Sequence, residues 1–201
     1  MTGQGALWLV RHGETEWSRD RKHTGRTDIP LTPRGEQQAG ALGPLFGSLL
    51  GSLPPALVLV SPRQRARRTA ELAGLVPCTV DQDVAEWDYG EYEGLTTPEI
   101  RQDRPGWTIW SADPPGGETA TQVGARADRV LARVRAALPA GDVIVVSHGH
   151  FGRVLAARWL GLEPAGGGMF ALEAAAPCLL DTEHGEPVVH RWSVPNPADA
   201  R

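Results

Sequence analysis

Apolar residues along the chain gather in short continuous runs, and longer stretches with helical spacing separate these runs. The runs at residues 6–10, 57–60 and 143–146 are rich in β-branched or bulky side chains and are bounded by small or polar residues. Such runs are typical of parallel strands that are buried on both faces. A shorter run at 78–80 is predicted to be a fourth strand.

The stretches between these runs carry helix signals. Thr32 and Pro33 open a helix that we expect to end near Leu50, with a break at Gly43 and Pro44. Because strands and helices alternate, the predicted fold is α/β: a three-layer sandwich in which a mostly parallel central sheet has helices on both faces. Further helices are expected over residues 63–73, 96–101, 119 or 121 to 138, and 151–160.

Outside this alternation the pattern is less regular. Residues 105–117 are rich in Pro, Gly and Trp, and we expect them to be the irregular part of a small cap formed by insertions over about 86–118. The last part of the chain predicts short strands at 170–173, 178–183 and 187–192, with a turn at 184–186. A frayed tail is expected over about 195–201. With 201 residues, the chain is expected to form a single domain, residues 1–201.

Composition narrows the class of protein. A formal net charge of −4 gives no basic surface for nucleic acid or an anionic membrane, and no apolar stretch approaches the ~20 residues of a membrane span. The first residues lack a basic region followed by an apolar core, so no secretory signal is expected. Cys78 and Cys178 are far apart and fit buried residues in a reducing compartment. These features predict a cytoplasmic protein.

Chemistry-bearing residues follow two of the predicted strands. Arg11, His12 and Gly13 come directly after residues 6–10, and Ser147 and His148 come after 143–146. In open α/β sheets, ligands bind outside the carboxyl ends of the strands. Two imidazoles and an arginine are therefore expected in one pocket, and such a set suits an enzyme that acts on phosphate. A histidine after a strand is more often a loop or core residue, but the duplication argues against that alternative here.

A third predicted strand is also followed by chemistry-bearing residues, and together the three strand ends resemble a known family. Residues 57–60 lead into Ser61-Pro62-x-x-Arg65-Ala66. With the Arg-His-Gly and Ser-His-Gly segments, this pattern resembles the histidine phosphatase superfamily, which includes the cofactor-dependent phosphoglycerate mutases. The resemblance extends from about Leu7 to Trp159. It implies a central sheet flanked by helices with a smaller cap.

The resemblance implies a role for each of these residues. His12 would be the nucleophile that becomes phosphorylated, Arg11 and Arg65 would bind phosphate oxygens, and His148 would donate to the same phosphoryl group. Elementary chemistry agrees, because a neutral imidazole is a competent nucleophile at cellular pH. Gly13 allows a close backbone approach and can orient the His12 ring through its carbonyl. Lys22 is the only lysine, so arginine abundance by itself is weak evidence for anion binding.

The general acid is expected within residues 85–94. By resemblance it is Glu86, while the residues alone leave Asp88 and Glu91 open. Flanking aromatic side chains, those of Trp87 and Tyr89, would partly desolvate a carboxyl group here and favour its protonated form.

Further substrate contacts are carried over from the resemblance: Ser18, Thr24, Gly25, Tyr89 and Gly149. Ser18 departs from the mutases, which carry Asn at this position. His150 is expected to be orienting or structural, and His184 and His190 to face solvent. No His, Cys or Asp set has the spacing of a zinc site, so neither a metal nor another cofactor is expected.

Three functions are compared. A mutase of this family has a longer insertion with extra basic residues, whereas the interval 87–147 has Arg101 and Arg104 but no adjacent arginine pair and no lysine. Its apolar Trp107 and Trp110 suggest a shorter cap that admits water, so we expect a metal-independent phosphatase. The chain looks closest to acid phosphatases and sugar-bisphosphatase-like members, with a small phosphomonoester, including a sugar phosphate, as substrate. The mutase is the alternative, and a non-catalytic phosphate-binding module is a third. A homodimer is also left open.

Overall fold

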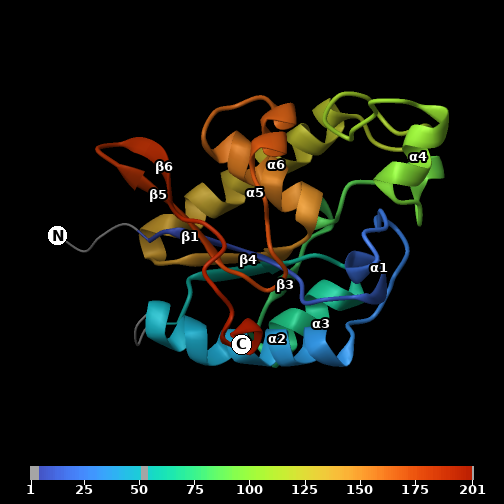
Figure 1. The fold of residues 1–201 in the computed structure, drawn as a ribbon. Coiled ribbons are helices and arrows are strands. Elements are labelled where there is room, and N and C mark those ends of the chain that lie inside the picture. Colours follow the sequence, from blue (N-terminus) through green and yellow to red (C-terminus); the bar gives the residue numbers. More distant parts are fainter. Residues whose placement is uncertain (1–4, 51–53, 201) are drawn as a thin grey trace.

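The computed structural model describes residues 5–50 and 54–200 and is built around one six-stranded sheet. The strand order is β3-β2-β4-β1-β5-β6 (Figure 1). Strands β1 to β4 run parallel to one another, and β5 and β6 form a hairpin whose strand β5 pairs antiparallel with β1. The mostly parallel α/β sheet predicted from the sequence is therefore confirmed. The strands are β1 (Leu7–Arg11), β2 (Leu57–Val60), β3 (Thr79–Val80), β4 (Val143–Ser147), β5 (Cys178–Glu183) and β6 (Glu186–Arg191).

Helices cover both faces of the sheet. In Figure 1, α2 and α3 lie on one face, α5 and α6 lie on the other, and α4 lies in the cap beyond the carboxyl ends of the parallel strands. These elements form the three layers that the alternation predicts. The helices are α1 (Glu16–Arg19), α2 (Pro33–Leu49), α3 (Gln64–Leu72), α4 (Thr97–Asp103), α5 (Ala120–Ala137) and α6 (Gly149–Trp159).

Alternate residues of the central strands face opposite cores, as the pleat of a strand requires. Leu7 and Leu9 of β1 pack with the α5 and α6 side, whereas Trp8 and Val10 pack with the α2 and α3 side. Both sets are almost completely buried. Burial on both faces explains why the strands read as continuous apolar runs, and it holds their carboxyl ends rigidly at one edge of the molecule.

Helix α2 differs from its prediction because it continues through Pro44 instead of breaking there. The proline is exposed, so the carbonyl that loses its hydrogen-bond partner can reach water. Leu42 and Phe46 on the opposite side are buried against the sheet. This packing holds the helix together across the proline.

Three further differences lie in loops and at the end of the chain. No helix was predicted between residues 14 and 30, but the structure has the short α1 there, which Thr15 and Ser18 cap reciprocally. Residues 170–173 form no strand, so that prediction is wrong. The frayed tail predicted over 195–201 is also wrong for its described part, because Asn196 is buried and its amide donates to the carbonyls of Gln38 and Ala175 at 2.9 and 2.8 Å. Because the buried Asn196 amide makes both of these hydrogen bonds, it holds the tail against α2.

No helix in the described ranges 5–50 and 54–200 is both long enough and apolar enough to cross a membrane. The two cysteines are unpaired, with Cys178 buried and Cys78 partly buried. Burial raises the pKa of the Cys178 thiol to about 11, which keeps the thiol protonated and unreactive.

Candidate active site

The carboxyl ends of β1 and β4 place the first two candidate residues side by side. Arg11 is in register with Ser147, and the amide of His12 donates to the carbonyl of Ser147 at 2.9 Å. His12 and His148 therefore leave neighbouring strands at the same edge, with ring centroids 5.2 Å apart. The strand-end placement inferred from the sequence is confirmed.

His12 is held by one hydrogen bond that fixes its tautomer. Its Nδ1 lies 2.7 Å from the carbonyl oxygen of Gly13 and donates to it, which leaves Nε2 as an unprotonated lone pair. Gly13 is needed here because a Cβ at this position would lie 2.4 Å from the carbonyl oxygen of Gly35. The predicted roles of the Gly13 carbonyl and of its close backbone approach are confirmed.

The surroundings of His12 keep the ring neutral. Burial lowers the pKa of His12 well below its ordinary value of 6.5, and the positive charges of Arg65 and Arg11 lower it further. The Gly13 carbonyl opposes this shift only in part. The His12 Nε2 is thus a free nucleophilic atom in a strongly cationic setting.

Arg65 and His148 lie directly behind this atom, and both are completely buried. The Arg65 Nε donates to His148 Nδ1 at 3.2 Å, and His148 Nε2 donates to the Ser61 hydroxyl at 2.6 Å. The remaining Arg65 hydrogen bonds run to the carbonyls of Thr24, Thr27 and Gly25 at 2.8, 3.0 and 3.3 Å. Arg65 therefore joins the second histidine to the loop after α1. Burial, followed by Arg65, lowers the pKa of His148 well below 6.5.

The side chain of Arg11 lines the cavity next to His12. Its Nη1 donates to the Leu172 carbonyl at 2.8 Å, while its buried Nε has no hydrogen-bond partner within residues 5–50 and 54–200. A buried donor left unpaired is costly, so an acceptor from a ligand would be favourable there. Burial lowers the pKa of Arg11, although Glu86 and Glu173 raise it.

Glu86 lies at the amino end of α6 and lines the same cavity as His12. Its Oε1 accepts the amides of Trp87 and Phe151, both at 2.8 Å, and its Oε2 accepts the amide of His150 at 3.1 Å. Two of these donors belong to the first turn of α6, where unpaired amides attract a carboxylate. The carboxyl group is thus fixed by three backbone donors and not by the aromatic side chains beside it.

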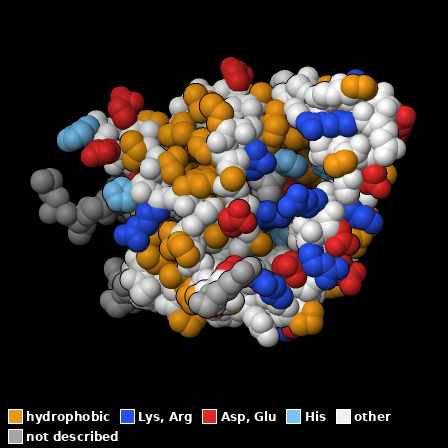
Figure 2. Space-filling view, viewed as in Figure 1, with side chains coloured by type: hydrophobic (Ala, Val, Ile, Leu, Met, Phe, Trp, Pro, Cys, Tyr) orange, Lys and Arg blue, Asp and Glu red, His pale blue; other side chains and the backbone are white. Residues whose placement is uncertain are grey.

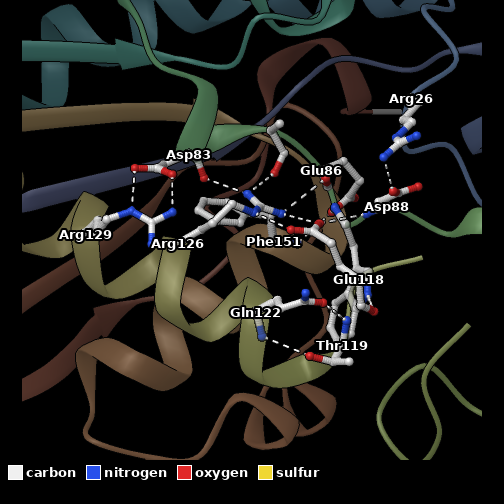
Figure 3. Close-up of polar contacts among 12 residues, drawn as sticks. Arg26, Asp83, Glu86, Asp88, Glu118, Thr119, Gln122, Arg126, Arg129 and Phe151 are labelled. Atoms are coloured by element: carbon white, nitrogen blue, oxygen red, sulfur yellow. Dashed lines mark hydrogen bonds and ion pairs between the residues drawn. The ribbon is translucent and has the colours of Figure 1, made fainter. Parts of the chain in front are cut away.

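A clamp behind Glu86 fixes its segment, as Figure 3 shows. Arg126 of α5 pairs with both carboxylate oxygens of Glu118, at 2.7 and 2.8 Å. The same guanidinium donates to the carbonyls of Asp83 and Ala85 at 2.7 and 3.0 Å. Side chains with 13% and 23% exposure make this a partly buried, bidentate pair. It links α5 to the backbone that carries Glu86.

A cavity of about 430 Å³ opens above Arg11, His12 and Glu86, which form its floor. Figure 2 shows histidine atoms recessed among cationic side chains on this face of the molecule. In the described part of the chain, four cationic side chains line the cavity against two carboxylates, so it suits an anion. The cations are Arg11, Arg21, Lys22 and Arg153, and the carboxylates are Glu86 and Glu173.

Most of the residues predicted for the site line this cavity: Arg11, His12, Ser18, Thr24, Glu86, Tyr89 and Gly149. Arg65 and His148 lie behind it. Gly25 is outside the lining, because its amide donates to the Glu93 carboxylate at 2.9 Å. The two other candidate acids are also outside: Asp88 pairs with Arg26 at 2.7 Å, and Glu91 is exposed. Geometry therefore favours Glu86 of the three carboxylates.

Sequence reasoning missed the opposite wall of the cavity. His23 lines it although no role was predicted for this residue, and His150, for which an orienting or structural role was predicted, lines it as well. The two rings are nearly parallel, at 13°, with centroids 5.9 Å apart. His23 directly precedes Thr24, and His150 directly follows Gly149, so adjacency to predicted contacts was the available signal. His184 and His190 are exposed, as predicted.

The described residues contain no group of three or more His, Cys, Asp or Glu side chains arranged to hold a metal ion. Comparison with known proteins then places this geometry in a family. Residues 7–195 match the histidine phosphatase superfamily (branch 1). The chain belongs to this superfamily.

Similar proteins agree with the match. An acid phosphatase of Mycobacterium tuberculosis is 46% identical over 89% of this chain and 87% of its own length. A sedoheptulose 1,7-bisphosphatase of Saccharomyces cerevisiae is 38% identical over 77% of this chain and 67% of its own. The solved structure of an open reading frame product from Mycobacterium tuberculosis superposes with a TM-score of 0.91 at 43% identity, covering 96% of this chain and 98% of that one. The chain is a phosphoric monoester hydrolase, and the phosphatase interpretation is favoured over the mutase.

Proposed function

We propose that this enzyme hydrolyses small phosphomonoesters through a phosphohistidine on His12. The His12 Nε2 lone pair attacks phosphorus while the bond to the ester oxygen breaks, and protonated Glu86 gives its proton to that oxygen. The Glu86 carboxylate then takes a proton from water, and the oxygen of that water attacks the phosphohistidine. Phosphate leaves, and His12 and Glu86 return to their starting forms.

The cationic floor stabilises the charge that moves onto the phosphoryl oxygens. Arg11 Nε supplies an unpaired donor. Both ring nitrogens of His148 are engaged in the resting site, Nδ1 by the Arg65 Nε and Nε2 by the Ser61 hydroxyl, so His148 acts by holding Arg65 in place. Arg65 then stabilises the same charge from behind.

A substrate of modest size fits the cavity. Its volume of about 430 Å³ is at the small end of the range for ligand sites. Of the relatives named above, one is named an acid phosphatase, and the other is named for a sugar bisphosphate, sedoheptulose 1,7-bisphosphate. Sugar phosphates are therefore the substrate class that we propose. A cytoplasmic location is proposed with it, and the unpaired cysteines support that location.

The observation that carries the proposal is the free His12 Nε2 at the floor of the cavity that Glu86 also lines. Purified enzyme should hydrolyse nitrophenyl phosphate and small phosphate esters much faster than it interconverts 2- and 3-phosphoglycerate. Activity should survive excess chelator, since the charge stabilisation proposed above comes from protein side chains. Mutase turnover that exceeds hydrolysis would overturn the proposal. Activity that chelator abolishes and added magnesium restores would overturn its metal-independent form.

A further inference from the structure

His23 is anchored in the same manner as the nucleophile. Its Nδ1 donates to the carbonyl oxygen of Leu95 at 2.8 Å, and its own amide donates to the same oxygen at 2.9 Å. The ring is therefore fixed, and Nε2 is an acceptor. The only hydrogen bond of the His23 side chain to the described residues is the one at Nδ1, and the side chain lines the cavity.

His150 presents the complementary atom. Its Nδ1 lies 2.5 Å from the hydroxyl of Tyr89, which is 2% exposed. Burial raises the pKa of Tyr89 well above its ordinary value of 10.0, so the phenol keeps its proton. That proton needs an acceptor, and Nδ1 of His150 is the partner that the structure gives it. The proton of the neutral His150 ring is consequently on Nε2, which makes this atom a donor.

Aromatic rings hold this pair in place. His23 packs edge-on against Tyr89 and Trp107, with centroids 4.8 and 5.5 Å away, and His150 packs against Trp110 at 5.2 Å. Burial lowers the pKa of His23 below 6.5 and that of His150 well below 6.5. Both rings therefore stay neutral, and the wall offers one acceptor and one donor without charge.

We propose that His23 and His150 form a hydroxyl-binding subsite that selects phosphate esters of polyols bearing a free hydroxyl close to the ester oxygen. A hydroxyl is a compact neutral group that donates and accepts at once. His23 and His150 line the same cavity with their ring centroids 5.9 Å apart, so a hydroxyl group of a bound ester can reach the acceptor of His23 or the donor of His150. This subsite rests on the proposed function, because it binds the alcohol part of an ester whose phosphate group lies at His12 and Arg11.

The experiment compares two esters with the same carbon chain: sn-glycerol 3-phosphate and n-propyl phosphate. The hydroxyl preference is the ratio of kcat/KM for the first ester to kcat/KM for the second. We expect a preference of about tenfold in the wild-type enzyme. His23→Phe keeps a flat ring but removes the acceptor, so it should lower this ratio by about tenfold. His23→Gln retains an acceptor and should retain part of the preference.

His190→Phe is the matched control, because it removes an exposed histidine on β6 that does not line the cavity. Thermal unfolding of each variant shows whether it is folded. A wild-type preference below about threefold overturns the subsite whatever the variants do. A folded His23→Phe enzyme with an unchanged ratio also overturns it. Hydrolysis of both alkyl esters without preference leaves the phosphatase intact, whereas no hydrolysis of any ester, nitrophenyl phosphate included, contradicts the proposed function itself.

Discussion

Two histidines in one cavity share a tautomer but differ in their neighbours. His12 and His23 both donate from Nδ1 to a backbone carbonyl, at 2.7 and 2.8 Å, and both leave Nε2 free. His12 is at the end of a central strand, between Arg11 and Arg65. His23 lies in the loop after α1 and faces the rings of Tyr89 and Trp107.

The contrast shows that the surrounding field, and not the tautomer, decides what each nitrogen can do. A phosphoryl group carries negative charge, so it is drawn to the arginines and meets His12. The charges that act most strongly on His23 are the carboxylates of Glu86 and Glu93, so its Nε2 suits a neutral hydroxyl group. One cavity thus separates the reacting part of a substrate from the part that is recognised.

The largest expected effect comes from replacing each histidine in turn. His12→Ala removes the atom that forms the covalent intermediate, so kcat/KM for nitrophenyl phosphate should fall by at least ~10⁴-fold. His23→Ala should lower it by less than about tenfold, since this substrate does not use the hydroxyl subsite. Steady-state assays of the two variants measure the difference. Similar losses of kcat/KM in the two variants would contradict the contrast drawn between His12 and His23.

Glu86→Gln tests the acid on the cationic side of the cavity. The amide is close in shape but cannot supply the proton, so hydrolysis of propyl phosphate should slow by about 10²- to 10³-fold. Nitrophenyl phosphate, whose leaving group needs little protonation, should lose much less. Equal losses on the two esters would remove Glu86 from the acid role.

Arg126→Leu tests the clamp that positions this acid. The change leaves the Glu118 carboxylate and the Asp83 and Ala85 carbonyls without their donor, so we expect a loss of about 2 kcal/mol in unfolding free energy. Hydrolysis of propyl phosphate should fall by about tenfold, with a smaller loss on nitrophenyl phosphate, because Glu86 is less well oriented.

Arg158→Leu is the control for this clamp, because Arg158 of α6 also pairs with both oxygens of a carboxylate, Asp128 of α5 at 2.8 and 3.0 Å, but has no contact with the Glu86 segment. It should not change the dependence on the leaving group. Chemical denaturation and the two esters report stability and acid function separately. A uniform loss on both esters in Arg126→Leu would indicate a structural effect alone.

The smallest expected effect concerns pH. A nucleophile with the ordinary histidine pKa of 6.5 would lose most of its neutral form between pH 6.5 and 5.5, and activity would fall several-fold. The pKa of His12 is well below 6.5 because of burial and the two arginines, so the ring stays neutral as the pH falls through that range. We expect kcat/KM for nitrophenyl phosphate to change by less than about twofold. A fall that follows an ordinary histidine titration would show that the field at His12 is weaker than described.

The sequence predicted the half of the site that strands build. Parallel strands bring their carboxyl ends to one edge, so Arg11, His12 and His148 could be placed next to one another from local pattern alone, although His148 lies behind the cavity that the other two line. Glu86 needed the family resemblance to rank it above two nearby carboxylates. The three amides that hold it became visible only in three dimensions.

The part of the site that contains His23 and His150 could not be predicted. The His23 tautomer depends on a carbonyl at residue 95, and that of His150 depends on a hydroxyl at residue 89. Arg126 was hidden in the same way, because an arginine on an amphipathic helix usually faces solvent. The tail was misread for a related reason, since Asn196 is polar in sequence but finds buried partners on α2 and near β5. Long-range polar partners leave no periodic signal.

The most direct test of the account is to locate the phosphoryl group during turnover. Enzyme mixed with substrate and quenched in alkali keeps a phosphohistidine intact. Trypsin then separates the candidates, since His12 falls in the peptide 12–19, His23 in 23–26, and His148 with His150 in 136–153. Mass spectrometry should find the phosphate on residues 12–19 alone, in acid-labile form. Phosphate on residues 23–26 or 136–153, or no phosphopeptide during rapid turnover, would contradict the central claim that the cationic field selects His12 as the nucleophile.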